Sequence, residues 1–358
     1  MTPLGQQLRE RIALEGPITV ERYMDLCLRH YYATRDPLGS QGDFTTAPEI
    51  SQMFGELIGL WMLEVWNAMG RPDPVHLVEL GPGRGTLMAD LLRATKLLPD
   101  FGKAVHVHLV ETSPVLRQKQ QAMLASMGMN IRWHERLDDI PEGPLLLVAN
   151  EFFDALPVRQ FVATERGWCE RLVGLDGDRL IFGLRAESET SLGNPLRLGD
   201  VLEWPSLSVD IMREISRRIA GGTGAALVID YGYWGPAFGD TLQALKKHAP
   251  VDPLNEPGEA DLTVHVDFQR LAQVASSQTL SVHGMSTQGD FLEALGIEAR
   301  ASSLKKRATP AQAADIEAAL TRLTQRGEKS MGELFKVLAV THRALEAVPG
   351  LPPLAAAP

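Results

Sequence analysis

Apolar runs alternate with amphipathic stretches through most of the chain. Runs rich in Val, Leu and Ile predict buried strands, and apolar residues spaced three and four positions apart predict helices. The predicted core strands cover residues 75–80, 104–110, 130–134, 144–149, 225–230, 279–285 and 334–341. The predicted core helices cover residues 85–97, 114–127, 208–220, 268–276, 289–295 and 310–326. This alternation is typical of an α/β protein with a parallel, doubly wound sheet.

The segments outside this core have other patterns. Residues 3–34, divided by Pro17, and residues 49–69 carry apolar side chains at helical spacing. Residues 158–205 instead predict short strands, with Asp176-Gly177-Asp178 as the turn of a hairpin. The predicted organisation is a helical N-terminal extension at 1–72, a core at 73–157 and 222–345, a β-rich insertion with a helix at 158–221, and a flexible tail at 346–358. Loops are predicted at 35–48 and 232–260.

Composition narrows the class of protein. The 358 residues are 44% hydrophobic and 22% charged, ordinary values for a globular protein, and the net charge of -10 argues against nonspecific binding to nucleic acid. The two cysteines, Cys27 and Cys169, have no metal-ligand spacing and fit a reducing compartment. No apolar stretch reaches the ~18 residues of a membrane span, and the N-terminus does not read as a signal peptide. We expect a cytoplasmic protein of bacterial type with no bound metal and no membrane insertion, and the sequence does not indicate its oligomeric state.

The turn after the first core strand carries the strongest functional signal. Glu79 ends the strand, and Gly81, Gly83 and Gly85 follow at every second residue before a helix begins. A dinucleotide-binding turn would have its third glycine at position 86, which is Thr86. The Glu79 carboxylate would repel a pyrophosphate but attract the ammonium of S-adenosylmethionine. A plain tight turn is the alternative, but the position between strand and helix favours a methyltransferase cofactor site.

A second acid ends the next core strand. Glu111 is placed to accept hydrogen bonds from the ribose hydroxyls of such a cofactor. Alternatively, Glu111 or Thr112 caps the helix that begins at Pro114, although Ser113 is the better candidate for the cap.

Polar residues also follow the strand at 144–149. Asn150, Glu151 and Asp154 come directly after an apolar run, where a buried polar group is costly unless it is paired or used. If this segment is helical, Glu151 and Asp154 lie on one face. We interpret the three as candidate residues of the ligand site, with helix capping by Asn150 or Asp154 as the alternative.

The predicted N-terminal loop could cover the cofactor. Asp43 and Thr45 are its candidate cofactor-binding residues, although Thr46 and Glu49 have the spacing of a capping box that would explain part of the cluster. Asp230 also ends a core strand and points to the same ligand edge.

Eight segments together resemble the MidA family, whose mitochondrial branch includes a complex I assembly factor that acts as a protein arginine methyltransferase. The segments are GDFTTAPEISQMFGELIG (42–59), LVELGPGRGTLMADLLR (77–93), VETSPVLRQKQ (110–120), NEFFDALPVRQF (150–161), VIDYG (228–232), HVDF (265–268), TQGDFLEALGI (287–297) and MGELFKVLAV (331–340). The resemblance implies a class I methyltransferase fold, S-adenosylmethionine as the methyl donor, and an arginine of the 49-kDa-type subunit of complex I as the target.

The resemblance also implies roles for individual residues. Glu79, Glu111 and the three turn glycines would hold the cofactor, and Asn150, Glu151 and Asp154 would lie at the acceptor side. Carboxylates suit an arginine acceptor, because they bind both arms of a guanidinium and stabilise its charge. Two alternatives remain open: a methyltransferase for a small molecule, and a non-catalytic complex I assembly chaperone.

Overall fold

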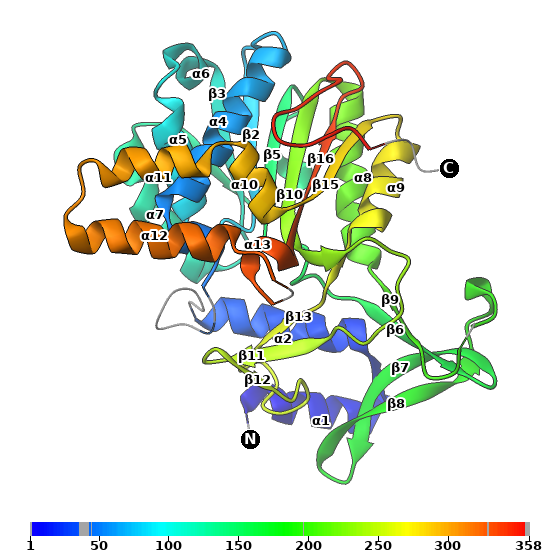
Figure 1. The fold of residues 1–358 in the computed structure, drawn as a ribbon. Coiled ribbons are helices and arrows are strands. Elements are labelled where there is room, and N and C mark those ends of the chain that lie inside the picture. The colour runs from blue at the N-terminus through cyan, green and yellow to red at the C-terminus, as the bar shows by residue number, and fades with distance from the viewer. Residues whose placement is uncertain (1, 36–42, 44, 196, 328, 355–358) are drawn as a thin grey trace.

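The computed structural model describes residues 2–35, 43, 45–195, 197–327 and 329–354, so most of the predicted loop at 35–48 lies outside the described residues. A central sheet has the strand order β15-β16-β10-β5-β2-β3-β4 (Figure 1). Its strands are β2 (Val75–Leu80), β3 (Val105–Val110), β4 (Ile131–His134), β5 (Leu145–Asn150), β10 (Gly224–Tyr233), β15 (Ser281–Thr287) and β16 (Phe335–Thr341). The strands from β4 to β10 are parallel, and β16 is antiparallel to both of its neighbours. The α/β class and the predicted doubly wound sheet are confirmed.

Helices cover both faces of this sheet because each has one apolar side. On one face, α4 (Gln52–Ala68), α5 (Thr86–Thr95) and α11 (Ile297–Lys305) share a buried cluster with alternate residues of the strands. On the other face, α8 (Ser206–Gly221) and α9 (Phe268–Ser277) form a second cluster. The chain reverses direction across the sheet between β2 and β5, and the carboxyl ends of these strands therefore form the crevice where ligands bind in such folds.

A smaller lobe lies below the carboxyl edge of the sheet (Figure 1). Helices α1 (Pro3–Glu15) and α2 (Val20–Thr34) share a buried cluster with β7 (Gly167–Asp176) and β13 (Asp261–Thr263). The remaining strands of this lobe are β1 (Ile18–Thr19), β6 (Arg159–Thr164), β8 (Arg179–Ser188), β9 (Val201–Trp204), β11 (Gln243–Lys246) and β12 (Ala249–Val251). Packing thus joins α1 and α2 to the predicted insertion, whereas α4 and α8 pack on the core sheet.

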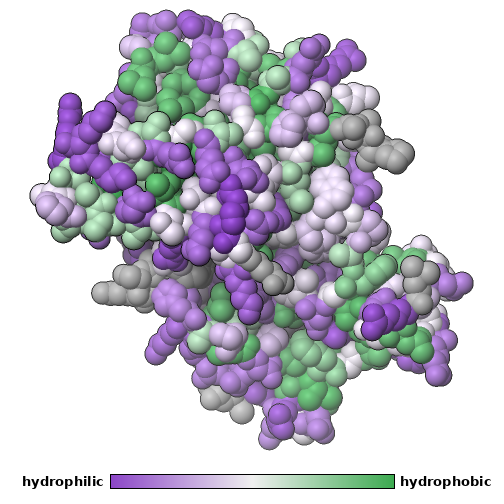
Figure 2. Space-filling model, viewed as in Figure 1, coloured by the Kyte–Doolittle hydropathy of each residue, from purple (hydrophilic) through white to green (hydrophobic). Residues whose placement is uncertain are grey.

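The predicted hairpin at Asp176-Gly177-Asp178 is confirmed as the turn between β7 and β8. This hairpin projects from the small lobe, and Figure 2 shows hydrophobic side chains gathered over it. Ile181 and Leu184 of β8 are 39% and 43% exposed.

The predicted loop at 232–260 is wrong in part, because it contains the β11–β12 hairpin. The turn residues Lys247 and His248 both have positive φ, at 52° and 61°, without the Asn-Gly signal that usually marks such a turn. Asp43 supports them instead: its Oδ1 accepts a hydrogen bond from Lys247 N at 2.7 Å, and its carbonyl accepts one from His248 N at 3.1 Å. A contact from a distant segment therefore replaces the local turn signal.

The C-terminal segment also differs from the flexible tail expected at 346–358. Gly284 N donates to Pro352 O at 2.8 Å and Leu354 N to Val282 O at 2.9 Å, so the described part of this segment runs along β15. Trp61 Nε1 donates to Pro349 O at 3.1 Å. Leu351 is 4% exposed and belongs to the cluster that contains α4 and α5. The position at the chain terminus predicted disorder, but apolar burial holds the described part of the segment in place.

Leu351→Ala should lower the free energy of unfolding by about 2 kcal/mol, because it removes a buried side chain and leaves a cavity. Denaturant unfolding measures the change. Leu14→Ala is the matched control, since Leu14 is 86% exposed and its removal should change stability by less than about 0.5 kcal/mol. Equal stability of the Leu351→Ala protein and the parent would mean that the segment is not packed in solution.

Candidate functional site

A large cleft lies at the carboxyl ends of β2, β3, β4 and β5. Its volume is about 1160 Å³, above the usual range of roughly 300–1,000 Å³ for small-molecule pockets. The core contributes the glycine turn and the polar residues after each strand, while α2 of the small lobe and α8 line other parts of the wall. The cleft therefore contains most of the sequence-predicted site residues: Glu79, Gly81, Gly83, Glu111, Asn150 and Glu151.

The glycine turn has the conformation that its sequence demands. Gly81, Gly83 and Gly85 have φ values of 60°, 54° and 86°, in the left-handed region that favours glycine. A Cβ on Gly81 would lie 2.9 Å from Cδ2 of the Phe152 ring, so a side chain there would clash. Gly85 is the N-cap of α5. The turn thus presents bare backbone to the cleft at the start of a helix, as a nucleotide-cofactor cradle requires.

Glu79 is a buried carboxylate without a cation. It is 3% exposed, and its Oε2 has no hydrogen-bond partner among the described residues. Burial, and to a smaller extent the nearby Glu111 carboxylate, raises the pKa of Glu79 to about 8. A buried carboxylate with an unused oxygen at the cleft wall fits a ligand that brings its own positive charge, as the ammonium of S-adenosylmethionine does.

Glu111 is held by the elements around it. Its Oε1 accepts a hydrogen bond from Ser113 N at 2.7 Å, and its Oε2 accepts one from Gln120 Nε2 at 3.0 Å. Gln120 Nε2 also donates to Gly83 O at 2.7 Å, so one side chain of α7 (Pro114–Leu124) joins Glu111 to the glycine turn. Burial raises the pKa of Glu111, and these hydrogen bonds oppose the rise. The cap of α7 is Ser113, as expected, which leaves Glu111 free to accept further hydrogen bonds from a ligand.

Asn150 and Glu151 form the wall of the cleft at the end of β5. Glu151 Oε1 accepts hydrogen bonds from Ala47 N at 3.0 Å and Asn150 Nδ2 at 3.2 Å. Asn150 Oδ1 is buried and has no partner among the described residues. Burial raises the pKa of Glu151 to about 8. An acceptor without a donor in that part of the chain therefore lies beside the Glu151 carboxyl at the end of β5.

Asp154 does not join this wall. The segment after β5 is not helical, because Glu151 has a φ of 51° in the left-handed region, so the expected shared face for Glu151 and Asp154 is wrong. Asp154 is 6% exposed, does not line the cleft, and has a buried Oδ1 without a partner in the described part of the chain. Burial raises the pKa of Asp154 to about 6. The alternative of helix capping is wrong as well, since no helix follows Asn150 or Asp154.

Asp43 and Thr45 lie outside the cleft lining. The Asp43 carboxylate accepts hydrogen bonds from Tyr31 OH at 2.6 Å and from Lys247 N, which ties the N-terminal segment to the β11–β12 turn. The expected capping box is also wrong, because Thr46 makes no side-chain cap to α3 (Ala47–Ile50). Glu49 instead accepts a hydrogen bond from the Thr86 hydroxyl at 2.5 Å, and it lines the cleft beside the glycine turn.

Sequence reasoning did not identify several other lining residues. Tyr32 comes from α2, and Leu207 and Ile211 come from α8, elements that only the tertiary fold brings to the cleft. Arg136 and Asp138 follow β4 and were detectable in principle, since they are polar residues directly after a predicted strand.

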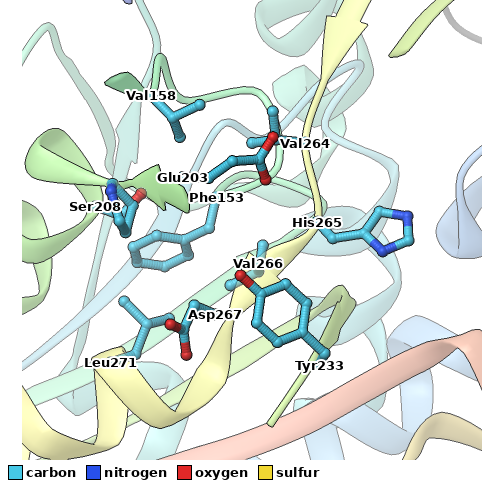
Figure 3. Close-up of a pocket in the computed structure, with 11 residues that line it drawn as sticks. Phe153, Val158, Glu203, Ser208, Tyr233, Val264, His265, Val266, Asp267 and Leu271 are labelled. Carbon is cyan, nitrogen blue, oxygen red and sulfur yellow. The ribbon is translucent and has the colours of Figure 1, made fainter. Parts of the chain in front are cut away.

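A second, much smaller cavity lies between β9, α8 and α9 (Figure 3). Figure 3 shows Glu203, Asp267, Tyr233 and His265 around it, with Phe153 on one side. Its volume is about 10 Å³, the space of a single water molecule, so it cannot admit a substrate.

The described residues contain no group of three His, Cys, Asp or Glu side chains arranged to hold a metal ion. Within the same residues, no helix combines the length and apolar character needed to cross a membrane.

Glu79→Gln should weaken binding of S-adenosyl-homocysteine, which carries the same ammonium group, by roughly 1.5–3 kcal/mol, the range for hydrogen bonds to charged groups. Gln has nearly the same volume, so the loss would report charge. Titration calorimetry measures the affinity, with Glu317→Gln on α12 (Pro310–Thr324) as the control because Glu317 is exposed on the surface. Unchanged affinity of the Glu79→Gln protein would place the ammonium elsewhere.

Known proteins resemble this chain over most of its length. The protein arginine methyltransferase NDUFAF7 homolog, mitochondrial, of Drosophila melanogaster is 38% identical over 382 residues, covering 96% of this chain and 86% of that protein. The Mus musculus protein arginine methyltransferase NDUFAF7, mitochondrial, is 40% identical over 340 residues, covering 86% of this chain and 77% of that protein. A crystal structure from Burkholderia thailandensis, bound to S-adenosyl-homocysteine, has a TM-score of 0.83 at 28% identity and covers 97% of this chain and 93% of that one.

The family comparison agrees with the geometry of the cleft. Residues 57–286 match the family described as "Putative S-adenosyl-L-methionine-dependent methyltransferase". The matched region contains the glycine turn, the buried Glu79 and Glu111, and the Asn150-Glu151 wall. The chain belongs to this family of S-adenosylmethionine-dependent methyltransferases.

Proposed function

We propose that the protein methylates an arginine side chain of a protein substrate, and that the substrate is the 49-kDa-type subunit of respiratory complex I. The names of the animal relatives, which describe protein arginine methyltransferases, support the acceptor type. The resemblance to the MidA family supports the complex I subunit. Those relatives are named as mitochondrial proteins, and the cytoplasmic location expected from the sequence stays a prediction for this chain.

The glycine-turn half of the cleft is the proposed cofactor site. Glu79 pairs with the cofactor ammonium, and Glu111 accepts hydrogen bonds from the ribose hydroxyls. Gly81, Gly83 and Gly85 allow the close approach of the backbone. When bound, S-adenosylmethionine supplies a methyl group on a positively charged sulfur.

The Asn150-Glu151 wall is the proposed acceptor site, and the unpartnered Asn150 oxygen beside a buried carboxyl is the observation that carries the proposal. Asn150 Oδ1 lacks a donor among the described residues, the Glu151 carboxyl lies next to it, and a guanidinium has five N–H donors and no acceptor. Glu151 binds the guanidinium and directs one nitrogen toward the methyl group. Its charge also stabilises the cation that remains after transfer. Asp154 does not line the cleft, so it adds negative charge near Glu151 without contacting the substrate.

The cleft has room for an acceptor beside the cofactor. Its volume of about 1160 Å³ exceeds what one small ligand usually occupies. Incubation with methyl-labelled donor, first with the isolated 49-kDa-type subunit and then with host lysate, tests the proposal. Labelled methylarginine in the subunit supports it. Label only in small molecules favours a methyltransferase that acts on a small molecule. No transfer at all favours a non-catalytic assembly chaperone.

Glu151→Gln should leave the fold and cofactor affinity nearly intact but lower methyl transfer by at least ~100-fold, the scale of one preorganised charge contact. Gln still accepts the hydrogen bond from Ala47 N, so the loss would report charge. Single-turnover methylation with saturating cofactor measures the rate. Asp154→Asn is the comparison and should have a smaller effect, because Asp154 lies outside the cleft. Transfer at the parent rate by the Glu151→Gln protein would mean that the acceptor site lies elsewhere.

The pH dependence should follow Glu151. Because burial raises the pKa of Glu151 to about 8, this carboxyl is largely protonated at neutral pH before the acceptor binds. Only the ionised form attracts a guanidinium, so kcat/KM for the acceptor should rise with pH and level off above about 8. A pH profile of the parent checks this rise. The Glu151→Gln protein should lack it, and an identical profile in both proteins would assign the titration to another group.

A further inference from the structure

The loop that carries the proposed acceptor residues is held by one buried side chain. Asp230, on β10 next to β5, is 0% exposed. Its Oδ2 accepts hydrogen bonds from three consecutive backbone N–H groups, those of Phe152, Phe153 and Asp154, at 3.2, 2.9 and 3.2 Å. Its Oδ1 accepts one from Tyr231 N at 2.9 Å. A buried N–H is costly to leave unpaired, so the three bonds from residues 152–154 fix the loop to the end of β10.

These bonds bear directly on the conformation of Glu151. Glu151 N donates to Ile229 O at 2.9 Å, the residue before Asp230. On its other side, the next residue, Phe152, is bound by the Asp230 carboxylate. Glu151 itself has a φ of 51°, a left-handed conformation that is unfavourable for a residue other than glycine. Such a conformation persists where its surroundings hold it, and here β10 holds the backbone on both sides.

Asp230 has no contact of its own with the cleft. It is absent from the cleft lining, whereas Glu151, Asn150 and Phe152 all belong to it. Its nearest acidic neighbours are Asp154 and Glu151, and together with burial they raise the pKa of Asp230, while its N–H partners oppose the rise. The side chain therefore acts on the site through the backbone that it binds.

We propose that Asp230 is a positioning residue of the methyl transfer reaction: by binding the N–H groups of residues 152–154, its carboxylate fixes Glu151 and Asn150 at the acceptor side of the cleft. This inference rests on the proposed role of Glu151. The cofactor half of the cleft, built on β2 and β3, does not depend on these bonds.

Two variants of different severity test the proposal. Asp230→Ala removes both acceptor oxygens, and with them all four hydrogen bonds, and should lower the single-turnover rate by about 100-fold, the effect of a misplaced catalytic group. Asp230→Asn keeps an oxygen for the loop N–H groups and should restore part of the rate, to within about 10-fold of the parent. Affinity for S-adenosyl-homocysteine should change by less than about 2-fold in both, since no cofactor contact is lost. If the Asp230→Ala protein does not fold, the Asp230→Asn protein still tests whether the carboxylate positions the loop.

Asp267→Asn is the matched control. Asp267 is a partly buried aspartate that accepts a backbone hydrogen bond, from Arg270 N at 3.0 Å, where it caps α9. Its replacement should lower stability but leave the transfer rate within about 2-fold of the parent. A loss of rate in Asp267→Asn equal to that in Asp230→Asn would reduce the role of Asp230 to general stability and overturn the proposal.

Hydrogen exchange separates this inference from the proposed function. Exchange of the amides of residues 152–154 should become faster in Asp230→Asn, with no change in the glycine turn. Unchanged exchange at 152–154, or a folded Asp230→Ala protein that transfers methyl at the parent rate, would overturn the inference. Absence of arginine methylation by the parent protein counts against the proposed function alone.

Discussion

Carboxylates buried at the ends of parallel strands determine what the rest of the cleft can bind. Glu79 retains an oxygen without a partner among the described residues, and burial raises the pKa of both Glu79 and Glu151 to about 8. Desolvation of a charge without compensation is expensive, so the free protein keeps these groups largely neutral. A positively charged ligand would change that balance. We therefore propose that the cleft binds two cations, the cofactor ammonium at Glu79 and the acceptor guanidinium at Glu151.

The N-terminal segment reaches both halves of the cleft. Ala47, at the start of α3, donates its N–H to Glu151, and Glu49 of the same short helix accepts a hydrogen bond from Thr86 beside the glycine turn. From the core sheet, β10 holds the loop of Glu151 through Asp230. Glu151 thus receives its position from two distant parts of the chain, the N-terminal segment and β10.

The sequence predicted the parts of this arrangement that depend on local pattern. The central strands, the glycine turn and the acids Glu79 and Glu111 follow from hydrophobic periodicity and from the rule that ligands bind at the carboxyl edge. Prediction failed where tertiary contacts decide the local structure. Lys247 and His248 adopt a turn that Asp43 stabilises from about 200 residues away in sequence, and no local motif encodes that contact. The left-handed Glu151 likewise depends on β10, and assuming a helix there paired Glu151 with Asp154 incorrectly. The apolar C-terminal segment was mistaken for a flexible tail because chain ends are often poorly ordered, and the burial of Leu351 depends on contacts that only the tertiary fold supplies.

The central claim is that these buried carboxyl groups are neutral in the free protein and ionise when a cationic ligand binds. The number of protons released on binding tests it most directly. Calorimetric binding of S-adenosyl-homocysteine near pH 7, in buffers with different ionisation enthalpies, measures the protons released. If Glu79 is neutral in the free protein and ionises when the ammonium arrives, binding should release protons, and Glu79→Gln should abolish most of that release. Binding that exchanges no protons in the parent, or releases as many from the Glu79→Gln protein, would contradict the account.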